Sequence, residues 1–332
     1  MTSQTPEKGF SITYPDDIPV IEIPARLSVL EAVLFKQTYH QLLNKNSLVE
    51  QIVLDFSQTK FIDSSGVGAL IHNFKASNKQ QVELILQNVQ PPVMSVLSLT
   101  KLDTVLKIQS WKQTTKQTQT KTSEKHLPET HPSVRCWIKR IMDIVGSIVG
   151  LAITGVFFIP IVIAIKIDSP GPIFFGQIRC GWMGKRFRIW KFRSMCVDAE
   201  ALKSQISNEV SGAFFKNKND PRITKVGRFL RRTSLDELPQ FWNVLKGEMS
   251  LVGTRPPTPD EVERYEVPEW QRLDVKPGMT GEWQVNGRSR VLNFEDVIKL
   301  DLRYQHNWSL KHDIQLILKT ILILFHKNSG AS

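Results

Sequence analysis

Residues 144–165 form an apolar run of 22 residues without a charged side chain, and no other feature restricts the fold of this chain as strongly. About 20 apolar residues in a helix suffice to cross the hydrocarbon core of a bilayer, so the run predicts a helix inside a membrane. Pro160 interrupts it, and a helix from residue 144 to this proline rises only about 24 Å against a core of about 30 Å. The length therefore permits a crossing, whereas the proline argues against a simple one.

Cations flank both ends of the apolar run, so under the positive-inside rule both ends prefer the cytoplasm. They are Arg135, Lys139 and Arg140 before it, and Lys166, Arg179, Lys185 and Arg186 after it. A helix that enters the membrane, breaks at Pro160 and leaves by the same face satisfies this preference. We therefore expect a re-entrant hairpin at about residues 137–167; the alternative is an ordinary crossing with a tolerated proline. A second apolar stretch, residues 314–325, is typical of an interfacial helix or of a core.

Composition divides the chain into two domains. Residues 112–133 are rich in Thr, Gln and Lys and poor in large apolar side chains, which predicts a flexible linker between domains at residues 1–111 and 134–332. The second domain holds 30 of the 43 Lys and Arg residues but only 20 of the 32 acidic ones, and so carries most of the net charge of +11. Such a surface suits anionic lipids and diphosphates. Nucleic acid would be attracted as well, but no nucleic-acid-binding motif is recognisable.

An adjacent carboxylate pair, Asp236 and Glu237, precedes a predicted helix in the basic domain. In one interpretation Ser234 is the N-cap of a capping box and Glu237 reaches back to its amide. Pro239 counts against that register, because it would remove a hydrogen bond inside the helix. In the other, Asp236 lies at the helix N-terminus, stays ionised there and acts as a nucleophile, while the exposed amides hold a phosphate.

Two basic segments suit the binding of phosphate near this pair. Arg255 lies in a turn stiffened by glycine and proline, and its guanidinium can hold two phosphate oxygens. Residues 185–193 alternate basic and apolar side chains as a half-buried strand does, but the alternation places Lys191 and Arg193 on the apolar side. Either a bulge resets the register, or these two cations point inward toward an anionic ligand.

Several ordered motifs in residues 135–325 resemble the bacterial sugar transferase family, the monotopic phosphoglycosyl transferases. They are residues 190–193 (WKFR), 220–222 (DPR), 234–240 (SLDELPQ), 253–256 (GTRP), 276–281 (KPGMTG) and 284–288 (QVNGR). The resemblance implies transfer of a sugar 1-phosphate from a UDP-sugar to polyprenyl (undecaprenyl) phosphate with Mg²⁺ as cofactor. This step initiates lipid-linked glycan synthesis for exopolysaccharide, capsule or O-antigen. The resemblance also implies a location at the cytoplasmic face of the bacterial inner membrane.

The same resemblance assigns roles to individual residues. Asp236 is expected to be the nucleophile that forms a covalent phosphosugar carboxylate, and Asp236 and Glu237 are the expected Mg²⁺ ligands. Substrate phosphates are expected at Arg255, Lys191, Arg193 and Arg222, and nucleotide or sugar contacts at Gln284, Asn286 and Arg288. The chain departs from the family pattern at Thr254, at Glu282 and at Ile159, which precedes Pro160; the family commonly has proline, tryptophan and serine at these places.

The first domain alternates predicted strands at residues 19–23, 51–56 and 82–86 with predicted helices at 28–43 and 66–78, which indicates a small α/β sheet. With Asp55 and residues 61–68 (FIDSSGVG), this order resembles the STAS domain of anti-sigma factor antagonists. The resemblance implies that Ser64 is a phosphorylation site acting as a charge switch. The alternative is that residues 63–65 only cap the following helix, in a domain used for docking or dimerisation.

We therefore expect an α/β protein with a small STAS-like α/β domain, followed by a mainly helical α+β membrane-associated transferase domain with a re-entrant helix. The expected partners are a nucleotide sugar, a polyprenyl phosphate, the membrane and a protein or second copy bound by the STAS-like domain. The competing interpretation is a non-catalytic membrane scaffold that recruits regulatory partners. The joint presence of Asp236, Glu237 and Arg255 counts against it, because a scaffold has no need of them.

Overall fold

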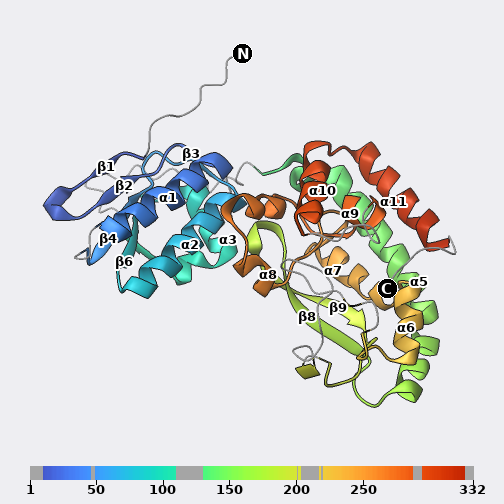
Figure 1. Cartoon of the computed structure of the whole chain (residues 1–332). Helices are drawn as coiled ribbons and strands as arrows, with labels where there is room; N and C mark the ends of the chain where they lie inside the picture. The colour runs from blue at the N-terminus through green and yellow to red at the C-terminus, as the bar shows by residue number, and fades with distance from the viewer. Residues whose placement is uncertain are drawn as a thin grey trace, which may run out of the picture. The chain divides into compact units, whose positions relative to one another are not determined.

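The computed structural model describes residues 10–45, 49–109, 130–199, 201–202, 217, 220–286 and 294–325. The chain divides into two compact units (Figure 1). Unit 1 consists of Met1–Thr130 together with Tyr265–Asp274, and unit 2 of His131–Arg264 and Val275–Ser332. Most of the predicted linker lies outside the described residues. The inclusion of Tyr265–Asp274 in unit 1 was not predicted from the sequence.

Unit 1 is built on a five-stranded sheet in the order β1-β2-β4-β6-β7, parallel except for β1. The strands of unit 1 are β1 (Ile12–Thr13), β2 (Val20–Glu22), β4 (Gln51–Asp55), β6 (Glu83–Gln87) and β7 (Lys107–Gln109), with β3 (Arg26–Leu27) and β5 (Phe61–Ile62) as a separate parallel pair. Its helices are α1 (Val29–Lys45), α2 (Ser64–Gln80), α3 (Pro91–Thr100) and the 3-10 helices η1 (Pro15–Asp17), η2 (Leu102–Thr104) and η6 (Val267–Asp274). The expected small α/β sheet is confirmed.

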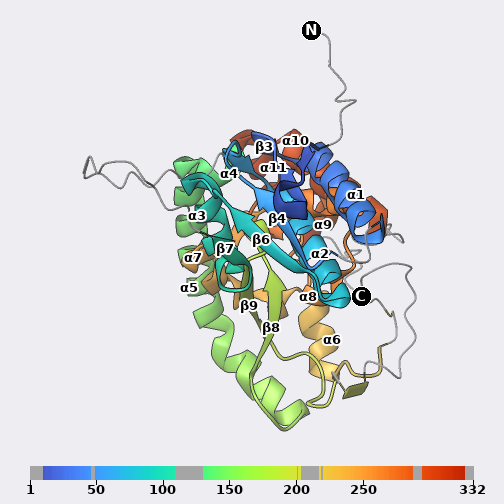
Figure 2. The same cartoon turned by 90° about the vertical axis from the view of Figure 1, so that its left-hand side faces the viewer.

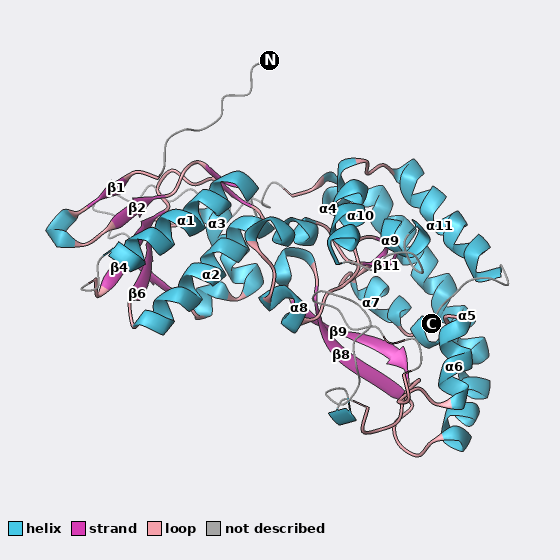
Figure 3. Cartoon of the chain, viewed as in Figure 1, coloured by secondary structure: helices cyan, strands magenta, loops and turns pink. Residues whose placement is uncertain are grey.

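Unit 2 is mainly helical and contains two small sheets. An antiparallel ribbon joins β8 (Phe174–Cys180) and β9 (Arg186–Phe192), and a parallel pair joins β10 (Ser250–Val252) and β11 (Gly278–Thr280) (Figure 3). Its helices are α4 (Pro132–Arg135), α5 (Trp137–Asp168), η3 (Trp182–Gly184), α6 (Lys225–Arg232), η5 (Leu235–Glu237), α7 (Gln240–Lys246), α8 (Pro259–Glu263), α9 (Glu282–Asn286), α10 (Phe294–His306) and α11 (Leu310–Phe325). The predicted α+β class is confirmed.

The apolar run forms the single helix α5, which is long and apolar enough to cross a membrane. The predicted break at Pro160 is absent, because the helix continues through this residue to Asp168. Figure 2 shows that the helix bends along its length. A proline removes one hydrogen bond of a helix and crowds the preceding turn, which is a known cause of bending. Packing on both sides of the proline holds the helix together.

One face of α5 packs along its whole length on the other elements of unit 2. Near its start, Gly146 and Gly150 allow close contact with Leu251 and Phe241. Near its end, Ile161 and Ile165 share a cluster with Phe192 and Leu230, and the carboxylate of Asp168 accepts a hydrogen bond from the first turn of α6. The opposite face exposes large apolar side chains: Val145, Ile148, Val149, Ile153, Val156, Ile159, Ile163 and Ile167.

Helix α11, like α5, has one face buried in unit 2 and an exposed face that is apolar. Leu316 is buried with Val252 and Tyr304, whereas the outer face carries the exposed apolar side chains Ile314, Leu318, Ile321, Leu322 and Leu324. A helix whose exposed face is this apolar is typical of one that lies in a membrane interface. The sequence expectation for residues 314–325 therefore agrees with the observed burial.

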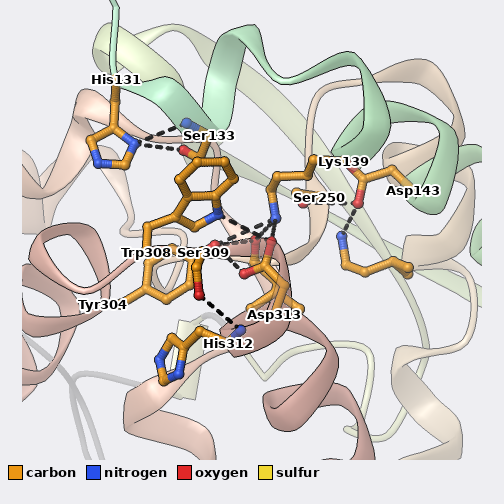
Figure 4. Close-up of polar contacts among 12 residues, drawn as sticks. His131, Ser133, Lys139, Asp143, Ser250, Tyr304, Trp308, Ser309, His312 and Asp313 are labelled. Carbon is orange, nitrogen blue, oxygen red and sulfur yellow. Dashed lines mark hydrogen bonds and ion pairs between the residues drawn. The ribbon is translucent and has the colours of Figure 1, made fainter.

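A buried ion pair joins the first turn of α5 to α11 (Figure 4). Lys139 Nζ lies 2.6 Å from Asp313 Oδ2 and donates to the Val252 carbonyl oxygen at 3.0 Å. The hydroxyl of Tyr304 and the indole N–H of Trp308 also donate to the Asp313 carboxylate, at 2.8 and 3.2 Å. Because Val252 ends β10, this network fixes the start of α5 to the strand that leads into the Arg255 turn.

Candidate active site

The carboxylate pair lies in the 3-10 turn η5, immediately before α7. Pro239 is the N-cap residue of α7, where its missing N–H removes no helical hydrogen bond. The capping-box interpretation is wrong, because Ser234 adopts a left-handed conformation (φ 56°) and its side chain makes no capping hydrogen bond. Asp236 is buried, with 6% of its surface exposed.

Strand β9 brings Lys191 to this pair. All seven residues of β9 have consecutive partners in β8, so the bulge is absent and Lys191 shares a face with the buried Phe187 and Ile189. Its Nζ lies 2.8 Å from Glu237 Oε1. Lys191 therefore points inward, as one of the two interpretations predicted. Arg193 is buried too, but its guanidinium donates to the carbonyl oxygens of Ser169 and Pro170 and thereby holds the chain after α5.

The environment of Asp236 opposes its ionisation. Burial raises the pKa of Asp236 and the charge of Glu237 raises it further, while the cations of Lys191 and Arg231 lower it. Desolvation is the largest of these effects, so the pKa is raised and not lowered as expected for a carboxylate at a helix terminus. Arg231, in the last turn of α6, donates to Ser194 Oγ at 2.9 Å. Sequence reasoning passed over Arg231 as a site residue, although it lies within five positions of Asp236.

The Arg255 turn is held by contacts between two motifs, residues 253–256 and 276–281. A Cβ atom at Gly253 would meet the backbone of residues 276–278, and the Gly278 amide donates to the Thr254 carbonyl oxygen at 2.9 Å. Thr254 is buried and its turn is well supported, despite the departure from proline. Arg255 itself donates to both oxygens of Glu261, at 2.7 and 3.1 Å.

Arg179, at the end of β8, is a site residue that the sequence did not single out. Burial and then the charge of Arg255 lower the pKa of its guanidinium to about 10, against the opposing effects of Glu261 and Glu237. Its Nη1 donates to the Pro256 carbonyl oxygen at 2.9 Å, next to Arg255. Two arginines and two carboxylates are thus close enough to affect one another. The sequence alone indicated Arg179 only as one of the cations that follow the apolar run.

The remaining predicted residues are engaged within the chain or lie outside its described part. Arg222 donates to both carboxylate oxygens of Asp220, and this side-chain hydrogen bonding is the main cause of the lowered pKa of Asp220. Gln284 donates to the Met279 carbonyl oxygen at 3.0 Å, and the side-chain amide of Asn286 donates to Glu282. Arg288 lies outside the described residues.

In unit 1, helix α2 begins at Ser64. Asp63 is its N-cap, and its Oδ1 accepts a hydrogen bond from the Gly66 amide at 2.9 Å. The capping role of residue 63 is therefore confirmed. Ser64 itself is completely buried. Its phosphorylation stays a prediction, which requires that the side chain first become accessible.

Residues 134–327 match the model of the family described as bacterial sugar transferase, and residues 10–115 match the STAS domain. The chain is similar to the galactosyl transferase CpsE of Streptococcus agalactiae, with 51% identity over 56% of this chain and 42% of that protein. It is 45% identical to the undecaprenyl-phosphate galactose phosphotransferase of Salmonella typhimurium, again over 42% of that protein. The chain thus spans about two fifths of the length of these relatives.

Two further comparisons concern smaller proteins. The exopolysaccharide production protein ExoY of Rhizobium meliloti is 38% identical over 55% of this chain and 83% of its own length. Among solved structures, a putative anti-sigma factor antagonist from Thermotoga maritima is 31% identical over 30% of this chain and 84% of its own, with a TM-score of 0.28.

Proposed function

The chain belongs to the bacterial sugar transferase family and carries a STAS domain before the transferase part, and from this we propose that it transfers a sugar 1-phosphate from a UDP-sugar to undecaprenyl phosphate. Relatives bear names of this kind, such as UDP-glucose:undecaprenyl-phosphate glucose-1-phosphate transferase of Escherichia coli. The observation that carries the proposal is the buried Asp236 beside Glu237, Lys191 and Arg231. The proposed product begins a lipid-linked glycan.

The proposed reaction proceeds in two displacements at one phosphorus atom. A carboxylate oxygen of Asp236 attacks the sugar-linked phosphorus of the donor, the bond to the second phosphate breaks, and uridine monophosphate leaves. An oxygen of the lipid phosphate then attacks the same phosphorus and releases the Asp236 carboxylate. Because Asp236 is buried, its carboxylate is poorly hydrated, which makes it a stronger nucleophile once it is ionised.

The residues present fit a divalent cation. Asp236 and Glu237 would hold Mg²⁺, which commonly uses one or two carboxylates together with substrate phosphates. The cation would neutralise the donor diphosphate and favour departure of the nucleotide. The burial of Asp236 next to Glu237 supports this assignment, because desolvation is the main cause of the raised pKa of Asp236 and a bound cation would offset it.

Arg179 and Arg255 supply a second feature that suits a diphosphate. The two guanidinium groups repel each other in a buried setting, and an anion bound between them relieves that repulsion. Replacement Arg179→Met is expected to raise the KM for the UDP-sugar by about 10- to 100-fold, the range of a lost charge-assisted hydrogen bond. Steady-state kinetics on Arg188→Met, an exposed arginine of the same ribbon, gives the control. An unchanged KM in Arg179→Met contradicts the assignment.

Because α5 continues through Pro160, a hairpin is absent, and for the membrane we propose one-sided embedding at the cytoplasmic face with α5 as an unbroken helix. The support is that other elements of unit 2 hold both ends of α5, at Lys139 through Asp313 and at Asp168 through α6. The outer face of the helix from Val145 to Ile163 carries large exposed apolar side chains. A helix that crossed the bilayer would leave its two ends in different aqueous compartments. The embedded surface then comprises the outer faces of α5 and α11.

This arrangement makes a topological prediction. In a variant without the native cysteines, single cysteines at Lys107 and at Lys299, which precede and follow α5 and are both exposed, should react with a membrane-impermeant maleimide from the same face. Inside-out and right-side-out vesicles separate the two faces. Reaction from opposite faces contradicts one-sided embedding and favours an ordinary crossing.

The function itself is tested with protein reconstituted in lipid nanodiscs. A panel of UDP-sugars is supplied with undecaprenyl phosphate, and release of uridine monophosphate is followed. Release with one donor, dependent on the lipid acceptor, is the expected result. If no donor in the panel gives release, the transferase proposal fails and the scaffold interpretation gains.

A further inference from the structure

The segment Tyr265–Asp274 belongs to unit 1 and contacts its helices α1 and α2. His72 of α2 contacts the Tyr265 carbonyl oxygen through Nε2 at 2.8 Å, and Lys36 of α1 pairs with Glu266 at 2.6 Å. Trp270 packs on Gly68: a Cβ atom added there would lie 2.5–2.7 Å from three atoms of the indole ring. The absence of a side chain at residue 68 therefore creates the place that the tryptophan occupies.

The segment also contributes to the start of helix α2. Asp274 Oδ1 accepts a hydrogen bond from the Ser64 amide at 2.9 Å, while Asp63 Oδ1 accepts one from the Gly66 amide at 2.9 Å. Two carboxyl groups, Asp63 of the STAS domain and Asp274 of the segment, thus accept hydrogen bonds from the amides of one helix N-terminus. Burial raises the pKa of Asp63 to about 6, and burial together with the charge of Asp63 raises that of Asp274 to about 7.

The flanks of the segment lead into the candidate active site. Glu261, which holds both nitrogens of the Arg255 fork, lies four positions before Tyr265. Gly278, whose amide holds the Thr254 carbonyl, lies four positions after Asp274. Binding of the segment therefore restrains, through only a few residues on either side, the two supports of the Arg255 turn.

We propose that the STAS domain is a docking module for residues 265–274 of its own chain, that the pair Asp63 and Asp274 acts as the release switch of this contact, and that docking restrains the Arg255 turn. With one carboxyl of the pair protonated, both accept their hydrogen bonds without mutual repulsion. With both charged, the contact weakens. The STAS domain thereby controls the transferase part through a covalently attached segment, without a separate protein partner.

The sign of the pH dependence follows from the direction of the pKa shifts. An undocked Asp274 has a pKa of about 3.9, so the docked state binds the proton more tightly. Docking is strongest below about pH 4, weakens as the pH rises to about 7, and stays weak above it. Other titratable groups also face the contact. Glu31 raises the pKa of Asp63, Lys36 lowers that of Glu266, and burial lowers that of His72.

Hydrogen exchange followed by mass spectrometry tests the proposal on the full chain in nanodiscs, without use of activity. After correction for intrinsic exchange rates, residues 265–274 should exchange about 10- to 100-fold faster at pH 8 than at pH 5. Asp274→Asn keeps an acceptor for the Ser64 amide and cannot ionise, so this variant should lose most of the pH dependence and exchange more slowly than the wild type at pH 8. A full pH dependence in Asp274→Asn overturns the role of the pair.

Gly68→Ala tests docking itself. The new methyl group displaces Trp270, so residues 265–274 should exchange about tenfold faster or more, while strands β4 and β6 stay protected. Gly155→Ala, at a helical glycine with nothing within 4 Å of the added Cβ, is the matched control and should leave the segment unchanged. The peptide covering residues 253–263 should loosen together with the segment. An unaffected segment overturns docking through Gly68, and a loosened segment with an unchanged Arg255 peptide overturns the coupling.

Discussion

Asp236→Asn is expected to reduce release of uridine monophosphate by roughly 10⁴-fold or more, the scale on which removal of a nucleophile acts. Asparagine has the shape of aspartate but cannot attack phosphorus to form the acyl phosphate. The variant should remain folded, because burial already favours the uncharged form of Asp236. Thermal unfolding of wild type and variant in the same nanodiscs checks that the loss is chemical. Asp260→Asn, at an exposed carboxylate of α8, is the matched control and should retain activity.

The pH profile provides a second measurement on the same group. The nucleophile must be ionised, and the pKa of Asp236 is raised by burial, so kcat/KM should increase as the pH rises through that pKa and fall below it. Full activity of Asp236→Asn is incompatible with Asp236 as the nucleophile. The same holds if the residual kcat/KM of Asp236→Asn still falls at low pH as it does in the wild type.

Asp313→Ala is expected to destabilise unit 2 by about 3–5 kcal/mol, the cost of leaving one charge of a buried ion pair without its partner. Lys139 and Asp313 expose only 5% and 0% of their side chains, so water cannot replace the lost contact. The hydroxyl of Tyr304 and the indole of Trp308 lose their acceptor as well. Thermal unfolding of the nanodisc-bound protein measures the effect.

The control for this variant is another carboxylate of the same region. Asp296 pairs with Lys299 at 3.5 Å on the exposed surface of α10, where both side chains are largely solvated. Exposed pairs of this kind contribute little, so Asp296→Ala should unfold close to the wild-type temperature. Equal destabilisation by both variants would show that the buried network around Lys139 has no special role in holding α5.

The sequence was most informative where a local pattern determines the structure. Three strands of unit 1, β2, β4 and β6, are short apolar runs bounded by turns and lie close to where they were predicted, because a parallel sheet covered by helices requires such runs. Strands β1, β3, β5 and β7 were not predicted. Strand parity left a bulge or an inward position for Lys191, and the pairing of β9 without a bulge decides for the inward position. The carboxylate pair was located because Pro239 restricts where α7 can begin.

Features that depend on packing between distant segments were not predictable in this way. Arg179 acquires its significance from Arg255 and Glu261, which other elements bring close. The continuity of α5 through Pro160 depends on contacts from unit 2 on both sides of the proline. The docking of Tyr265–Asp274 has no local signal either, because Gly68 and Trp270 are separated by about 200 residues.

The central claim, that Asp236 carries the sugar phosphate between donor and lipid, is tested most directly by mass spectrometry of the rapidly quenched enzyme. Protein mixed with the UDP-sugar in the absence of undecaprenyl phosphate should gain the mass of one sugar phosphate, located by fragmentation on Asp236. Addition of the lipid acceptor should remove this mass at least as fast as steady-state turnover. Turnover at full rate without such an adduct, or an adduct on another residue, would contradict the account.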